Sequence, residues 1–507
     1  MDKVQNIMNK QIKVGAILGY ITVIVNIFIG FFSVSLLTKY LGQGEYGVYS
    51  LIGSVIGYLS IMDFGMHNVT IRYVSTYKQD DKEAEAKFIG MTFKIYLVID
   101  IVLLLIGGLI YVFFPYIFGQ GLNAEELTLA KSLFVPLLFN LLISLPGAVF
   151  EAIEFAYEKF IFVKGLLLIK LISKLILMIA ILSIGGRSLA LVYLDTFLNV
   201  LIIVIEMIYA LCVLHVKPDF KNTDKKLFKE VSRYTSYVFL ASISDQVNWK
   251  LDSILLGVIS GSAAVAVSSV GMQLVNVFRN FTSIMSGVFL PRVTQMVKQN
   301  SDNKKLTDVM ITVGTIQLFI IGLIINGFVA VGHDFIRIWA GSEYLDAFWI
   351  FFVIALALII PSTQSIGINI LEAKNMHSFR AKVYAFISIF NVLLSIVLID
   401  KYGVIGAAVG TAVTAVVGSN IIINVYYYKT VHLEIPRFFK EVFLRQIPPI
   451  LLSMITSYLL FQIIYVESMI LRVLIKGVAV VAIYIVYMCI FGVVKEIMRV
   501  LSIKRSI

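Results

Sequence analysis

Charged residues are scarce in this chain. Asp, Glu, Lys and Arg make up 14% of its 507 residues and hydrophobic residues make up 59%, whereas a soluble domain carries about 25% charged residues. A long polar segment is also lacking, since the longest one lies near His215–Arg233. These two deficits exclude an ordinary soluble protein and leave no room for an enzymatic domain outside a membrane.

Residues that carry redox or metal chemistry are few. The two cysteines, Cys212 and Cys489, lie in apolar segments, where an isolated thiol is usually a small core residue. The chain has no Gly-x-x-x-x-Gly-Lys-Ser/Thr motif, which excludes an ATPase motor of that type. We therefore expect no catalytic residues, no metal and no cofactor. The five histidines are scattered over loops without metal spacing: His67, His215, His333, His377 and His432.

About fourteen apolar stretches fill the sequence instead, and each is long enough to cross a bilayer, which takes about 20 residues. They predict an all-α polytopic membrane protein with about 14 transmembrane helices. The first stretch is too long for the apolar region of a signal peptide, so we expect it to be retained. The predicted spans are 14–38, 46–66, 88–114, 131–150, 164–184, 188–214, 234–258, 262–290, 307–332, 348–371, 382–399, 404–428, 446–466 and 469–492.

The basic residues are distributed unevenly between these spans. Most of the 42 Lys and Arg residues fall in every second gap and at the two chain ends, whereas the other gaps are short and often acidic. Because Lys and Arg collect in cytoplasmic loops, both termini are predicted to be cytoplasmic. The net charge of +11 is then explained by attraction to anionic lipids, not by nucleic acid.

A weak internal repeat places the first six spans over the next six. Residues 35–37 resemble residues 253–255, and residues 150–152 resemble residues 371–373. Internal repeats are common in transporters, which bind their cargo at the repeat interface. The repeat predicts an N-terminal lobe at 1–214, a cytoplasmic linker at 215–233, a C-terminal lobe at 234–428, and two extra helices with a basic tail at 429–507.

Six basic residues are embedded in apolar stretches, where a cation is expensive and indicates a function. Arg279 lies about 16 Å from the cytoplasmic end at the helical rise, and snorkelling usually reaches only from helix ends. A guanidinium matches phosphate oxygens, so Arg279 is interpreted as a phosphate ligand, with a structural ion pair as the alternative. Lys250 is interpreted likewise, or it pairs with an aspartate on its own helix. The six are Lys94, Lys170, Lys174, Lys250, Arg279 and Lys476.

Polar side chains on predicted helix faces extend this candidate site. Lipid cannot surround such helices, because each unpaired polar group there costs several kcal/mol. The first span carries Asn26 beside Gly15 and Gly19, which more simply indicate close helix packing. The predicted substrate-binding residues are Asn26, Gln246, Lys250, Gln273, Asn276 and Arg279.

Carboxylates inside the spans provide candidates for ion coupling. Asp195, Asn199 and Glu206 share one helical stripe, and Asp245 lies in the seventh span. Intramembrane carboxylates relay protons or hold coupling ions, here H⁺ or Na⁺. They can equally neutralise Lys170 and Lys174, which stand one turn apart, and the sequence leaves both interpretations open.

Four segments of the chain resemble one family of membrane proteins. They are Leu36–Tyr49, Asp63–Gly65, Asp252–Gly257 and Lys401–Ala408. In these patterns of turns and helix ends the chain resembles the polysaccharide and O-antigen flippases of the multidrug/oligosaccharidyl-lipid/polysaccharide exporter superfamily. The patterns carry no catalytic fingerprint.

The resemblance implies two pseudo-symmetric six-helix lobes around a central cavity. It implies a polyprenyl-diphosphate-linked glycan as cargo, carried across the bacterial cytoplasmic (inner) membrane for cell-surface polysaccharide synthesis, beside a polysaccharide polymerase and glycosyltransferases. A lipid II flippase and a multidrug or cation exporter of the same superfamily are the alternatives. Drug exporters often carry a carboxylate in the first span, where this chain has Asn26. A membrane-embedded polymerase or glycosyltransferase is disfavoured by the short loops.

Overall fold

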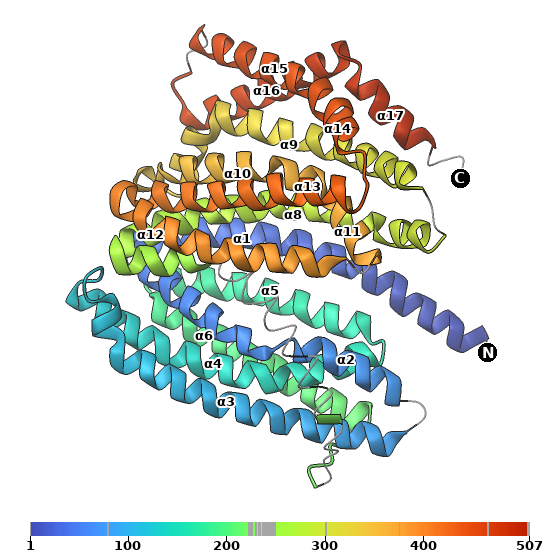
Figure 1. Cartoon of the computed structure of the whole chain (residues 1–507). Coiled ribbons are helices and arrows are strands. Elements are labelled where there is room, and N and C mark those ends of the chain that lie inside the picture. The colour runs from blue at the N-terminus through green and yellow to red at the C-terminus, as the bar shows by residue number, and fades with distance from the viewer. Residues whose placement is uncertain are drawn as a thin grey trace. The chain divides into compact units, whose positions relative to one another are not determined.

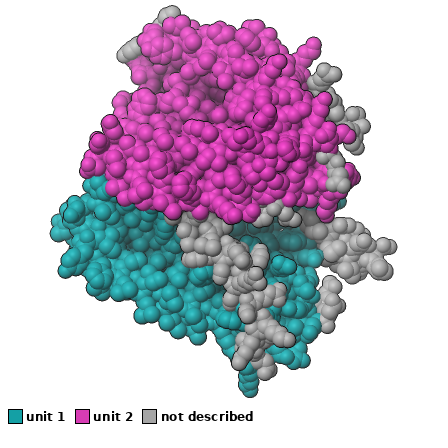
Figure 2. All heavy atoms as spheres, in the orientation of Figure 1, with its two compact units in different colours: residues 1–266 teal, residues 267–507 magenta. Residues whose placement is uncertain are grey.

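The computed structural model describes residues 2–78, 81–221, 227, 228, 231, 235, 250–299, 302–374, 376–463 and 466–503. Every regular element in these ranges is helical (Figure 1). The chain divides into two compact units, residues 1–266 and residues 267–507 (Figure 2). The predicted bounds of the two lobes and of the linker stay a prediction.

Unit 1 is a bundle in which α4 is central, since this helix packs against α1, α2, α3, α5 and α6. A capping box starts α4: Glu126 N donates to Asn123 Oδ1 at 2.9 Å, and Asn123 N donates to Glu126 Oε2 at 3.0 Å. The elements are α1 (Asp2–Leu59), η1 (Ser60–Asp63), α2 (Met66–Tyr77), α3 (Lys82–Phe118), α4 (Ala124–Ala156), α5 (Phe160–Ser183), α6 (Ser188–Ile208) and the π-helical η2 (Tyr209–Val213). Residues 250–259 are also helical.

Unit 2 is built around α9, which packs against α10, α15 and α16. Helix α8 (Ser262–Lys298) begins in unit 1 and continues into unit 2. The other elements are α9 (Asn303–Trp339), η3 (Ser342–Tyr344), α10 (Ala347–Thr363), α11 (Ser365–Ala373), α12 (His377–Ala415), η4 (Val416–Ile422), α13 (Ile423–Lys429), α14 (Ile435–Phe438), η5 (Phe439–Phe443), α15 (Leu444–Ile463), α16 (Met469–Ile490) and α17 (Val493–Ile503).

The described residues contain ten helical stretches that are long and apolar enough to cross a membrane. Two of these, Lys13–Tyr77 and Ser378–Lys429, have 65 and 52 residues. At the helical rise they are about 98 and 78 Å long, so each is long enough for two crossings. Helix α8 is not among the ten, and the predicted span at 234–258 lies mostly outside the described residues. The prediction of an all-α polytopic membrane protein is confirmed.

Both long stretches turn at a glycine with a positive φ angle. The φ angle is 75° at Gly42 and 57° at Gly403, a conformation that residues with a Cβ rarely adopt. Hydropathy predicts short loops over residues 39–45 and 400–403. The structure instead keeps the flanking residues helical and concentrates each turn in a single residue.

Two helix ends differ from the prediction in ways that matter for the site. Hydropathy ends the fourth span at residue 150, whereas α4 continues to Ala156. The predicted span at 348–371 is divided at Gln364 into α10 and α11. An apolar window detects the hydrocarbon-spanning part of a helix, but it does not detect polar turns that extend the helix or a break inside it.

Candidate functional site

Polar side chains inside the described spans of unit 1 join α4, α5 and α6. Lys174 Nζ lies 2.8 Å from Asp195 Oδ1 in an ion pair whose two side chains are 36% and 23% exposed. The structure therefore favours the interpretation in which Asp195 neutralises a lysine. Its predicted role in ion coupling is left as a proposal.

One helical turn away, Lys170 is held by a neutral partner. Lys170 Nζ donates to Asn199 Oδ1 at 2.8 Å. The Asn199 amide donates in turn to Asn140 Oδ1 at 2.8 Å and to Ser144 Oγ at 2.6 Å on α4. Asn140 and Ser144 were not selected from the sequence, because isolated small polar residues on an apolar helix give no signal until a partner helix is placed against them.

The third member of the predicted stripe, Glu206, is buried and only 7% exposed. It interacts electrostatically with Glu151 on α4 and with Lys170 on α5. Glu154 on α4 also lies within electrostatic range of Glu206 and is fully buried. Glu154 is not among the predicted site residues, because the fourth span was predicted to end at residue 150.

Lys250 packs closely against α1 within unit 1. Its ammonium lies next to Gly57, where an added methyl group would overlap with Nζ. The helix that carries Lys250 also approaches α1 at Gly257, where an ideal Cβ would lie 2.6 Å from Leu51 Cδ1. The absence of a side chain at Gly57 is thus what leaves room for the Lys250 ammonium. The neighbouring candidates Asp245 and Gln246 lie outside the described residues.

Helix α8 has one apolar face and one polar face in unit 2. Phe278 is buried against Phe351 of α10, with ring centroids 6.0 Å apart. Gly271 approaches Ile350, to which an ideal Cβ would lie 2.8 Å away. On the rest of the helix, Asn276 is exposed, whereas Gln273 and Arg279 are half-buried. These three polar residues therefore lie outside the fully buried packing face that Phe278 and Gly271 belong to.

On α1, the residues that pack and the residue proposed to bind cargo differ in burial. An ideal Cβ at Gly15 would lie 2.5 Å from Phe160 Cβ, and Thr22 and Ile29 continue this buried face. Gly19 has nothing within 4 Å of such a Cβ, and Asn26 is exposed. Close packing thus accounts for Gly15 and does not account for Gly19 or Asn26.

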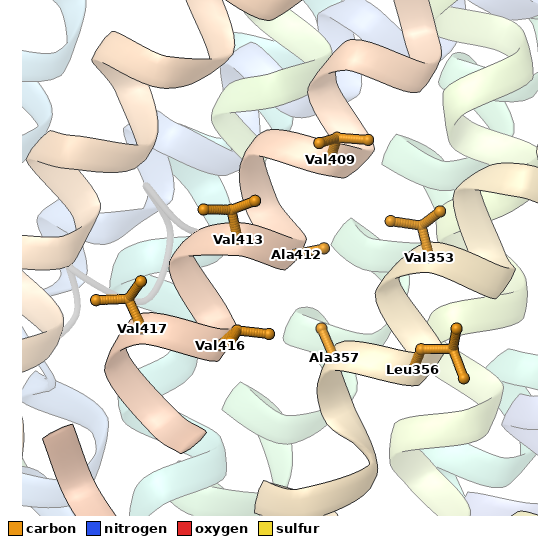
Figure 3. Close-up of a pocket in the computed structure, with 8 residues that line it drawn as sticks. All are labelled: Val353, Leu356, Ala357, Val409, Ala412, Val413, Val416 and Val417. Atoms are coloured by element: carbon orange, nitrogen blue, oxygen red, sulfur yellow. The ribbon is translucent and has the colours of Figure 1, made fainter. Parts of the chain in front are cut away.

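An apolar groove of about 370 Å³ lies between α10 and the α12–η4 helix (Figure 3). Its lining contains only aliphatic side chains and alanines, so it suits a hydrocarbon chain and offers no ligand to a phosphate or a sugar. Leu356 and Val413 are 44% and 41% exposed at its edges. The lining residues are Val353, Leu356, Ala357, Val409, Ala412, Val413, Val416 and Val417.

The two cysteines correct one expectation from the sequence. Both Cys212 and Cys489 are free, but both are exposed, so they are not core residues. In a membrane protein, apolar helix surfaces face lipid, and an apolar sequence context therefore does not imply burial. In the part of the chain that the structure describes, no group of three or more His, Cys, Asp or Glu side chains is arranged to hold a metal ion.

Comparisons with known sequences agree with the pattern of turns. Residues 13–297 match the family described as "Polysaccharide biosynthesis protein". The probable low-salt glycan biosynthesis flippase Agl15 of Haloferax volcanii is 23% identical over 211 residues, or 42% of this chain and 43% of Agl15. The uncharacterized membrane protein MJ1068 of Methanocaldococcus jannaschii is 22% identical over 371 residues, or 69% of this chain and 70% of that protein. The match thus spans less than half the length of Agl15.

Comparisons with solved structures identify the fold. The lipid II flippase MurJ in an inward closed conformation superposes with a TM-score of 0.75 at 18% identity, covering 94% of this chain and 98% of MurJ. An inward-facing multidrug resistance MATE family transporter of the MOP superfamily gives a TM-score of 0.60 at 13% identity, covering 80% and 99%. The chain therefore has the fold that these transporters share.

Proposed function

Because this chain belongs to the polysaccharide biosynthesis protein family, we propose that it is a flippase for a polyprenyl-diphosphate-linked oligosaccharide. It moves this lipid across the cytoplasmic membrane by alternating access and so supplies cell-surface polysaccharide synthesis. The observation that carries the proposal is the family match over residues 13–297. The protein is proposed to leave its cargo chemically unchanged, so it is not an enzyme.

The physical task of such a protein is to move a diphosphate through a hydrocarbon layer. Burying an unpaired charge is prohibitive, so the path must provide cations and water. Arg279 is the proposed phosphate ligand, because its guanidinium can bind two oxygens at once. Lys250 is a second cation on the path. The prenyl tail stays in lipid, because an apolar chain needs no polar path.

The glycan is proposed to pass along polar helix faces. Asn276 and Gln273 offer amide donors and acceptors on the polar face of α8, and Asn26 and Gln246 are proposed to do the same from the first and seventh spans. Amides suit a sugar, because each carries both donors and acceptors for hydroxyl groups.

Outward movement is proposed to be coupled to inward H⁺ or Na⁺. The candidates are Asp195, Glu206 and Asp245. The ion pair of Asp195 with Lys174 supports a structural role for that carboxylate, whereas the burial of Glu206 supports a role in which its charge changes. We therefore rank Glu206 above Asp195.

The cellular setting is also proposed here. The protein lies in the cytoplasmic (inner) membrane of a bacterium, with both termini inside, as the alternation of basic gaps indicates. It acts beside the glycosyltransferases that build the lipid-linked glycan and the polymerase that consumes it. Lipid II transport and the export of a drug or cation are the alternatives. The charge of the cargo distinguishes a drug or cation exporter from a flippase, because the lipid-linked cargo of a flippase is anionic.

The test is export of a lipid-linked glycan by cells that carry Arg279→Ala. We expect export to fall sharply at a normal protein level, with partial recovery in Arg279→Lys. Arg337→Ala is a matched control, because Arg337 is an exposed arginine at the end of α9. Undiminished export in Arg279→Ala would remove this residue from the site. Loss of activity in Asp245→Asn with tolerance of Arg279→Ala would favour the cation exporter.

A further inference from the structure

One carboxyl group in unit 1 is buried without any partner. Glu154 lies near the C-terminal end of α4 and is 0% exposed. Neither of its carboxyl oxygens has a hydrogen-bond partner in the described part of the chain. A buried carboxylate without donors carries one of the largest penalties in a protein, and binding a proton removes that charge.

A second buried carboxyl group lies within electrostatic range of the first. Helices α4 and α6 run side by side in Figure 1 and approach closely at Gly147, where an ideal Cβ would lie 2.6 Å from Ile203 Cδ1. On these two helices, Glu154 interacts electrostatically with Glu206, which is itself 7% exposed. Two like charges in such a setting disfavour each other's ionised form.

Other titratable groups interact with the pair or lie near it. Glu151 on α4 interacts with both carboxyl groups, and Tyr209, the first residue of η2, interacts with Glu154. Tyr209 stacks on Phe162 of α5, with ring centroids 3.9 Å apart. On α2, the ring of His67 lies 6.1 Å from that of Phe155, the residue that follows Glu154. The π-helical turn that begins at Tyr209 is of a kind that occurs frequently at functional sites.

Lys170 provides a charge that can respond to the pair. It interacts with Glu206 electrostatically, but its ammonium donates to the neutral Asn199 side chain. When Glu206 is ionised, the cation offsets its charge. When Glu206 holds a proton, Asn199 keeps the ammonium in place, so Lys170 has a partner in both states.

We propose that Glu154 and Glu206 form a proton-binding site in unit 1 that is loaded and emptied during transport. Each step moves one proton between a carboxyl oxygen and water, and no bond of the cargo changes. The proposed binding of the proton is supported by the burial of Glu154 and by the absence of hydrogen-bond partners for its carboxyl oxygens in the described residues. Its coupling to lipid movement rests on the proposed function.

The binding step can be tested without any cargo. The full-length protein in lipid nanodiscs is titrated with acid and base while the carboxylic C=O stretch is followed by infrared difference spectroscopy. We expect a protonated carboxyl band that disappears in Glu154→Gln and persists in Glu125→Gln, a matched control because Glu125 is exposed at the other end of α4. Identical spectra of the wild type and Glu154→Gln across the titration would overturn the proposal.

Two further arms keep the result unambiguous. If Glu154→Gln does not fold, Glu206→Gln serves instead, and it is expected to change the pH range over which the remaining band titrates; an unchanged range would count against a shared site. Added NaCl, compared with choline chloride, should leave the band unaltered. A sodium-specific change would show that the site binds Na⁺ and would overturn the assignment of a proton.

The coupling step is measured separately in vesicles. In vesicles that carry a pH gradient, the wild-type protein should flip the lipid-linked glycan faster than in vesicles without one. The flipping rate of Glu154→Gln should be the same with and without the gradient. A gradient response retained in Glu154→Gln would overturn the coupling. Failure of the wild type to flip the glycan at all would refute the proposed function and leave the infrared result intact.

Discussion

Lys174 and Asp195 form an ion pair between α5 and α6, with Nζ 2.8 Å from Oδ1. The pair explains how a lysine can lie in a predicted membrane span without binding cargo. It also separates Lys174 from Lys170, whose hydrogen bond goes to Asn199. Two lysines one turn apart therefore have different environments, and their substitution should have different consequences.

For the Lys174–Asp195 pair, we expect each single substitution, Lys174→Met or Asp195→Asn, to lower the thermal midpoint of the purified protein. Removing one partner leaves the other charge uncompensated. The double variant should recover most of the loss, giving a coupling energy of about 1 kcal/mol, as is usual for polar pairs between membrane helices. Additive losses in the double variant would show that the pair contributes nothing beyond its separate parts.

For Lys250, we expect Gly57→Ala to impair export with little loss of stability. The added methyl group overlaps with the ammonium of Lys250, the flexible end of a side chain, so the cation moves and the backbone stays. Export should fall at least about fivefold, equal to ~1 kcal/mol. Gly53→Ala is the control one turn earlier, because an ideal Cβ there has nothing within 4 Å. Equal export in the two variants would argue that the position of Lys250 is unimportant.

For the C-terminal helices, we expect Tyr484→Phe to weaken the attachment of α16 to α9. The Tyr484 hydroxyl is in a fully buried ring and donates to the backbone oxygen of Phe319 at 2.7 Å. Its loss should reduce the free energy of unfolding by about 1 kcal/mol. Tyr458→Phe on α15 should change nothing, because Tyr458 is 63% exposed. Equal free energies of unfolding for the wild type, Tyr484→Phe and Tyr458→Phe would show that the hydrogen bond contributes nothing to stability.

The spans could be predicted from the sequence because lipid imposes a strong constraint on helix length and hydropathy. The turns were harder. Gly42 and Gly403 each end one crossing and start the next without leaving helical geometry on either side. A window of hydropathy cannot distinguish such a turn from a short loop, since both interrupt the apolar run for only a few residues.

The candidate site was predicted less completely, and Glu154 shows why. Sequence gives the depth of a residue along its helix, but burial depends on which helix packs against it. Glu154 is three residues from Glu151 on the same helix, yet Glu154 is fully buried and Glu151 is half-buried. The prediction that Cys212 is a core residue was wrong for the same reason, because Cys212 and its apolar neighbours are exposed.

The polar face of α8 leads to a test of water access. The exposed Cys212 and Cys489 are first replaced by serine, and single cysteines are then placed at three positions. We expect Asn276→Cys to react with a membrane-impermeant maleimide, because Asn276 is exposed beside other polar groups and a hydrated thiol can ionise. Leu274→Cys should be protected, because Leu274 is 6% exposed. Ile389→Cys on α12 provides the decisive control: Ile389 is 65% exposed on an apolar helix surface, so it should be protected by lipid and not by protein. Protection of Asn276→Cys to the same degree as Ile389→Cys would place the polar face of α8 in a dry environment, and a diphosphate could not pass along it.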